Sequence, residues 1–132
     1  MENKYLLELK ISTVSKCLTS LKEALSEPYS TVIRDATLLR FRNSVDTFWK
    51  FLKEYLKVSR GITVNSPKDS FREIFSQGFT SEEETKELLD MTDSRNETAH
   101  TYKEDLAQEI YEKIKGYASL MNKVLMKIVD KK

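Results

Sequence analysis

Apolar residues recur at alternating intervals of three and four along three long stretches of the chain. Side chains with this spacing share one face only if the backbone is helical, because an α-helix turns once every ~3.6 residues. The three stripes are Leu7, Ile11, Val14, Leu18, Leu21 and Leu25; Leu38, Phe41, Val45, Phe48, Leu52 and Tyr55; and Ala107, Ile110, Ile114, Tyr117, Met121, Val124 and Ile128. The pattern therefore predicts three long amphipathic helices, each with one face in the core.

Local signals set the ends of the first two helices. The first should span about residues 3–26, because Pro28 lacks an N–H and disfavours helix in the residue before it. The second should cover residues 31–60, with Gly61 placed to adopt the positive φ that often ends a helix. The second stripe carries Phe41, Phe48 and Tyr55, with Trp49 beside it, so we interpret it as a core-facing surface.

Two shorter helices are marked by the residues that begin them. Ser66 is placed as an N-cap with Pro67 at the first helical position, and this helix should end at Gly78. Ser81 and Glu84 have the spacing of a capping box, which predicts the start of a fourth helix of middling length.

The last long helix is expected to begin at Tyr102, because Thr101 and Glu104 again have capping-box spacing. The sequence thus predicts an all-α fold, an up-and-down helical bundle of four main helices plus a short connecting helix. Three glycines and two prolines are too few for a turn-rich β-sandwich. A chain of 132 residues has room for one such domain, spanning 1–132, and none for a separate cofactor domain.

Composition excludes several classes of function. One cysteine and one histidine cannot form a thiolate or imidazole zinc site within one chain, so we expect neither a metal nor a cofactor. Cys17 cannot form an internal disulfide, and we expect it to be a buried small hydrophobe. The net charge of +1 gives no broad basic face for nucleic acid. No stretch approaches the ~18 apolar residues of a membrane span, so we expect a cytoplasmic protein with no membrane partner.

The single histidine lies in the one segment that carries reactive groups. His100 follows Arg95 by five residues, with Asn96 between them and Tyr102 two residues beyond. In an unbroken helix Arg95 and His100 would lie ~140° apart around the axis. Either the helix breaks near residues 99–101 and lets the ring fold back toward Arg95, or a second copy of the chain completes the site. Asn96 could orient the ring from one turn earlier.

An arginine beside a histidine suits chemistry on a phosphodiester. A guanidinium can hold two phosphate oxygens, and an imidazole can move a proton to or from a ribose oxygen without a metal. The alternative is a solvated helix end in which Arg95 pairs with Glu84, Asp90 or Glu97. Spacing alone leaves both interpretations open.

Three segments resemble one known family. Residues 95–102 are similar to the Arg-x4-His-x-Tyr motif of HEPN-domain proteins, and residues 66–78 and 41–56 resemble two stretches of the branch called nucleotidyltransferase substrate-binding proteins. The similarity covers nearly the whole chain as one HEPN-like domain. The second helix departs from the usual Phe-Glu, because Asn43 and Ser44 stand there and Asp46 is the nearest acid.

This resemblance implies an all-α protein that dimerises and is encoded beside a minimal nucleotidyltransferase. Some members are toxins that cut RNA without a metal, using residues equivalent to Arg95 and His100. The nucleotidyltransferase is then the antitoxin and transfers AMP to the tyrosine equivalent to Tyr102. We therefore expect a metal-independent endoribonuclease that acts as a homodimer on RNA. The alternatives are a non-catalytic substrate-binding subunit of a two-chain nucleotidyltransferase and a purely structural bundle.

Overall fold

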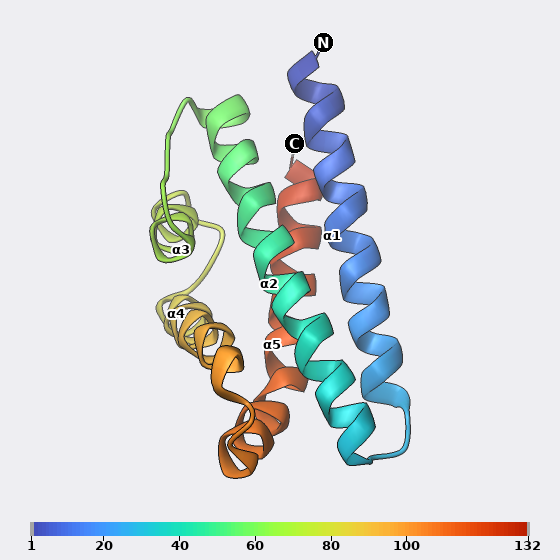
Figure 1. Ribbon diagram of the computed structural model, residues 1–132. Helices are drawn as coiled ribbons and strands as arrows, with labels where there is room; N and C mark the ends of the chain where they lie inside the picture. The colour runs from blue at the N-terminus through green and yellow to red at the C-terminus, as the bar shows by residue number, and fades with distance from the viewer. Residues whose placement is uncertain (1, 132) are drawn as a thin grey trace.

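The computed structural model describes residues 2–131 of the chain, and every element in that range is helical. The elements are α1 (Glu2–Ser26), α2 (Thr31–Arg60), α3 (Pro67–Ser76), α4 (Glu82–Glu97), a 3-10 turn at Thr98–His100, and α5 (Glu104–Lys131). Figure 1 shows α1, α2 and α5 side by side along the length of the molecule, with α3 and α4 packed beside α2. The predicted bundle of four main helices and one short connector is confirmed.

The helix ends follow the local signals in the sequence. Ser30 caps α2 by accepting a hydrogen bond from the Ile33 N–H at 3.0 Å, and Gly61 ends it at φ 67°. Ser66 caps α3 in the same way. Both capping-box bonds between Ser81 and Glu84 are present at the start of α4, at 2.9 and 3.1 Å. Each cap satisfies backbone groups that have no partner within the helix.

The three predicted stripes form one core. In α5 all seven stripe residues are buried, and in α2 all six are. In α1, Ile11 and Leu25 are only partly buried, whereas the other four stripe residues are buried. Cys17 differs from the expectation, because it lies at the edge of this stripe and is half-buried.

The start of the last helix also differs from the expectation. α5 begins at Glu104 and not at Tyr102, because both members of the predicted capping box have other partners. The Thr101 hydroxyl donates to the Thr98 carbonyl, and the Glu104 carboxylate binds Arg34 of α2. Residues 101–103 instead form a turn that connects the 3-10 segment to α5.

No helix in the described part of the chain is long and apolar enough to cross a membrane.

Candidate functional site

Arg95 lies in the last turn of α4 and faces α2. Its guanidinium forms a two-bond ion pair with Asp46, from Nε to Oδ1 at 2.7 Å and from Nη2 to Oδ2 at 2.8 Å. The expected alternatives, Glu84, Asp90 and Glu97, are therefore wrong as partners of Arg95. Asp46 lies at the middle of α2, so the pair fixes the guanidinium against the longest helix of the bundle.

The pair is partly shielded from water. The Arg95 side chain is 22% exposed and that of Asp46 is 33% exposed. The hydrogen bonds that Arg95 donates to Asp46, and to a smaller degree the charge of Asp46, raise the pKa of Arg95, although burial acts in the opposite direction. The guanidinium therefore stays charged. Two of its five N–H groups bind Asp46, so three remain to bind an anion.

An open pocket of about 370 Å³ lies beside this ion pair. It is formed where α2, the start of α3 and the end of α4 meet, and the residues that matter for its chemistry are Asp46, Trp49, Lys50, Pro67, Arg95 and Asn96. Lys50 and Asn96 are exposed, whereas Trp49 is half-buried. The pocket thus combines an aromatic wall with cationic and amide groups.

His100 lies one short turn beyond this pocket along the chain. Its side chain is exposed, at the end of the 3-10 segment that follows α4. The helix does break before the last helix, as the first of the two arrangements drawn from the sequence requires. Among the side chains that the structure describes, the His100 ring forms no hydrogen bond with Arg95 or Asn96.

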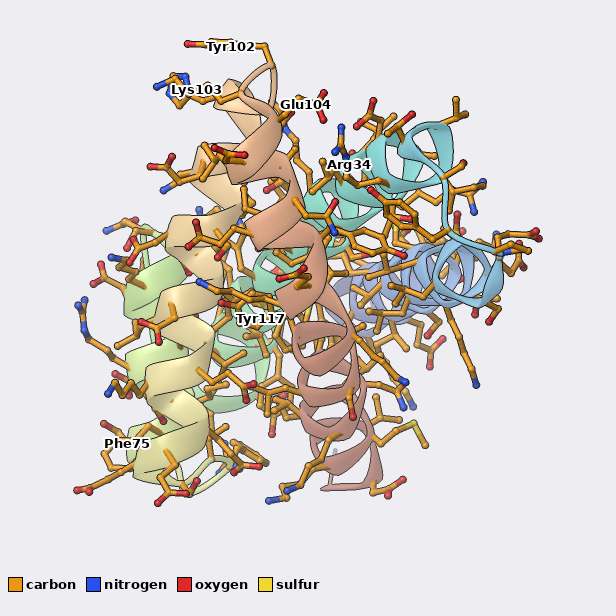
Figure 2. All side chains as sticks on the ribbon, turned by 90° about the horizontal axis from the view of Figure 1, so that it is seen from below. Arg34, Phe75, Tyr102, Lys103, Glu104 and Tyr117 are labelled. Atoms are coloured by element: carbon orange, nitrogen blue, oxygen red, sulfur yellow. The ribbon has the colours of Figure 1, made fainter. Side chains whose placement is uncertain are left out.

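Tyr102 projects from the tip of the turn between α4 and α5. Its side chain is 76% exposed, and Figure 2 shows it pointing away from the bundle, beside Lys103. The Tyr102 and His100 rings meet edge to face, with centroids 6.1 Å apart. The Lys103 ammonium lies 6.0 Å from the Tyr102 ring centroid. The phenol is thus open to a partner and close to the only imidazole of the chain.

Arg34 ties this turn to the rest of the molecule. It is 3% exposed, and it donates to Glu104 Oε2 at 2.8 Å and to Asp35 Oδ1 at 3.2 Å. Figure 2 shows Arg34 and Glu104 facing each other across the end of the bundle. The hydrogen bond from Arg34 lowers the pKa of Glu104, and Glu104 in turn raises the pKa of Arg34. The first turn of α5, which begins two residues after Tyr102, is thereby fixed to α2.

The structure places the predicted residues on the end of α4 and on the turn that follows it, but does not assemble them into a single contact. Arg95 and Asn96 line the pocket, and His100 and Tyr102 lie on the adjoining turn. Sequence reasoning did not identify Arg34 as a tertiary anchor. Its signal was present, because Arg34 precedes Leu38 by four residues and so places a charge on the buried stripe of α2.

Arg95 can bind an anion and His100 can move a proton, but each chain supplies only one imidazole. Arg95 offers three N–H donors, and His100 offers a ring that solvent and substrate can reach. The acidic run at residues 82–84 begins α4. No group of three or more His, Cys, Asp or Glu side chains in the described range is arranged to hold a metal ion.

Comparisons with known proteins place the chain in a family. A family model described as "nucleotidyltransferase substrate binding protein like" matches residues 9–130. A crystal structure of a protein from Thermus thermophilus shares 40% sequence identity and superposes with a TM-score of 0.84. That match covers 87% of this chain and 98% of the other. None of the proteins with curated descriptions matches the sequence.

Proposed function

The chain belongs to the nucleotidyltransferase substrate-binding protein-like family, a HEPN-type helical family, and on that premise we propose that it is an endoribonuclease that needs no metal. It cleaves RNA in the cytoplasm as the toxin of a pair whose antitoxin is a minimal nucleotidyltransferase. Arg95 and His100 carry the reaction, Asn96 supports them, and Tyr102 is the site at which AMP transfer switches the enzyme off.

The observation that carries this proposal is that one chain holds the Arg95 guanidinium in place and exposes the His100 ring. Asp46 holds the guanidinium at a fixed angle and leaves three of its N–H groups free, and the His100 ring is exposed on the adjoining turn. A fixed guanidinium stabilises the negative charge that builds on phosphate oxygens during transesterification.

The reaction is an internal displacement at phosphorus. The ribose 2′-oxygen forms a bond to the phosphorus, the bond to the 5′-oxygen breaks, and the products are a 2′,3′-cyclic phosphate and a 5′-hydroxyl. One group must accept the 2′-hydroxyl proton while another delivers a proton to the leaving oxygen. Because one chain supplies one imidazole, two chains related by a two-fold axis supply both.

AMP transfer to Tyr102 accounts for control by a partner. The phenolic oxygen attacks the α-phosphorus of ATP, pyrophosphate leaves, and the phenolic proton passes to solvent. The product carries a nucleotide and a negative charge at a ring whose centroid is 6.1 Å from that of His100. The added bulk and charge oppose the approach of an RNA phosphate. The exposure of the phenol supports its access to a second enzyme.

A second candidate function is favoured by the family description itself. In it the chain is a non-catalytic subunit that presents a substrate to a nucleotidyltransferase, and Arg95 and His100 bind a phosphate without turnover. The two functions share the pocket and the partner. They differ in whether the chain alone breaks a phosphodiester bond.

The test incubates the purified chain alone with RNA in excess EDTA. We expect cleavage by the wild type, loss of it in His100→Ala and Arg95→Ala, and no loss in Lys86→Ala, which removes an exposed cation elsewhere on α4. Thermal unfolding should show the His100→Ala fold unchanged, since the side chain is exposed. Cleavage that persists in His100→Ala would overturn the assignment. No cleavage by the wild type, with complex formation with the neighbouring nucleotidyltransferase, would support the subunit instead.

A further inference from the structure

The pocket beside the Arg95–Asp46 pair has a wall that the cleavage chemistry does not use. Asp46, Trp49 and Lys50 lie at positions i, i+3 and i+4 of α2, so they share one face of the helix. Asn96 contributes from α4, and Pro67 closes the pocket at the start of α3. Three helices therefore place an indole, a pyrrolidine ring, an ammonium and a primary amide around one space next to the guanidinium.

We propose that this pocket holds the base of a nucleotide whose phosphate lies on Arg95. The inference rests on the proposed function, because it takes the nucleotide to be part of a single strand of RNA. A free nucleotide presents the same chemistry. Trp49 and Pro67 supply the apolar contact with the base, Asn96 reads its edge, and Lys50 and Arg95 bind phosphate. Trp49 thereby becomes a binding residue, distinct from the catalytic Arg95 and His100.

The chemistry of the lining matches a base with its phosphate. Aromatic side chains that stack on bases and cations that follow the backbone are the two features common to single-strand binding. Trp49 is half-buried, so part of the indole is exposed, and the Lys53 ammonium lies 5.8 Å from its ring centroid. An amide such as that of Asn96 offers both donors and an acceptor to a base edge.

The charge of the pocket also fits a phosphate. Lys50 and Arg95 contribute two positive charges and Asp46 one negative charge, and Lys50 forms no ion pair with any residue from 4 to 130. The pocket between α4 and α5 offers a contrast, because four carboxylates and two lysines line it. The pocket beside Arg95 has one excess positive charge; a pocket between α1 and α5 has two, from Lys22 and Lys115, but no aromatic side chain lines it.

The spacing along the chain joins the pocket to the reaction. Arg95 lies in the last turn of α4 and His100 ends the 3-10 segment that follows it, so the two residues lie on consecutive segments of the chain. In this proposal a nucleotide with its base against Trp49 places its phosphate beside Arg95, and His100 lies on the segment of the chain that follows.

Trp49 is the only tryptophan of the chain, so its fluorescence reports on this pocket directly. The experiment uses the full-length His100→Ala protein in EDTA, which binds without cleaving. The probes are a single-stranded RNA of roughly four nucleotides, the lower end of known site sizes, and, in separate arms, AMP and ribose 5-phosphate. We expect saturable quenching by the RNA and no comparable quenching by ribose 5-phosphate, which lacks a base. Quenching by AMP as strong as that by RNA would support the pocket and assign it to free nucleotide.

Variants in the same background separate the contributions, with binding followed by anisotropy of labelled RNA. Trp49→Leu removes the ring but keeps an apolar side chain, and it should weaken binding roughly ten- to a hundredfold. Lys50→Ala and Asn96→Ala change exposed residues, so they carry the test if Trp49→Leu does not fold. Lys57→Ala is the matched control, because this exposed lysine lies about two turns further on the same side of α2.

Failure of this proposal and failure of the proposed function give different results. Quenching and weakened binding in the variants, without cleavage by the wild type, would leave the pocket standing and remove the nuclease. Cleavage by the wild type with full affinity in Trp49→Leu, Lys50→Ala and Asn96→Ala would remove the pocket and leave the nuclease. Equal affinity for ribose 5-phosphate and AMP would also overturn the proposal, because it would show a phosphate site with no place for a base.

Discussion

Asp46 uses both carboxylate oxygens to hold one edge of the Arg95 guanidinium. A planar fork held at two points cannot rotate freely, so its remaining N–H groups keep one direction. In the proposed reaction that direction decides whether a phosphate is held in line for attack. Asp46 is therefore a positioning residue, since it acts through Arg95.

Asp46→Asn tests this role. The amide keeps the shape of the side chain but removes the charge and one acceptor, so we expect RNA cleavage to fall at least about tenfold through misplacement of Arg95. The pair is partly exposed, so unfolding in urea should show a loss of only about 1 kcal/mol. Glu109→Gln, which breaks an exposed ion pair with Lys113, is the control and should change neither RNA cleavage nor the free energy of unfolding. Wild-type cleavage by Asp46→Asn would show that the pair has only a structural role.

Tyr102→Phe tests the proposed site of control. Removing the phenolic oxygen removes the nucleophile, so labelled AMP from ATP should no longer be transferred to the chain by the partner nucleotidyltransferase. RNA cleavage by the variant should match that of the unmodified wild type and should resist the partner. Tyr5→Phe is the control, because Tyr5 is also largely exposed but lies on α1. AMP transfer to Tyr102→Phe at the wild-type level would place the modified residue elsewhere.

At the level of the elements, α4 is held at both ends by groups from other helices. Its last turn is bound to α2 through Arg95, and at its first turn Glu84 binds Lys123 of α5 at 2.7 Å while closing the capping box with Ser81. The Lys123 hydrogen bond, with help from the Ser81 backbone, lowers the pKa of Glu84 to about 2. The helix that carries Arg95 is thus fixed to two others.

Glu84→Gln should make stability depend less on pH. The wild-type advantage is present above the ordinary glutamate pKa of about 4.5, and it is lost as the pH falls from there toward about 2. Glutamine keeps the oxygen that accepts from Ser81, so the lost charge should cost about 1 kcal/mol at neutral pH. Urea unfolding between pH 7 and pH 2 measures the difference. Glu83→Gln, which changes an exposed neighbour, is the control. An equal loss of unfolding free energy in both variants at every pH would contradict the assignment of this pH dependence to Glu84.

The helices could be predicted from the sequence because their signals are local. The 3–4 spacing identifies α1, α2 and α5, and Ser66 and Ser81 mark helix starts within three residues of their partners. The same local reasoning was wrong at Thr101, because its predicted partner Glu104 binds Arg34, which lies 70 residues away in sequence. The candidate site divides in the same way. The residues Arg95 and His100 follow from a short motif, whereas the pairing of Arg95 with Asp46 joins positions 49 residues apart and needed the fold.

At the scale of the whole molecule, the near-zero net charge limits how the chain can bind RNA. It provides no broad basic surface, so affinity must come from a small cationic region such as the one around Arg95 and Lys50. In the proposed dimer, two paired chains double that region and bring two His100 side chains into one cleft. The proposed reaction therefore needs a dimer for chemistry as well as for binding.

The most direct test of the account is the rate of RNA cleavage in EDTA as wild-type chains are exchanged with His100→Ala chains at constant total concentration. If each cleft needs two histidines, only wild-type pairs are active, and an equal mixture should retain about one quarter of the wild-type rate. The cleaved strands should end in a 2′,3′-cyclic phosphate. Retention of about half the rate would contradict the paired site, and the absence of cleavage by pure wild type would contradict the nuclease itself.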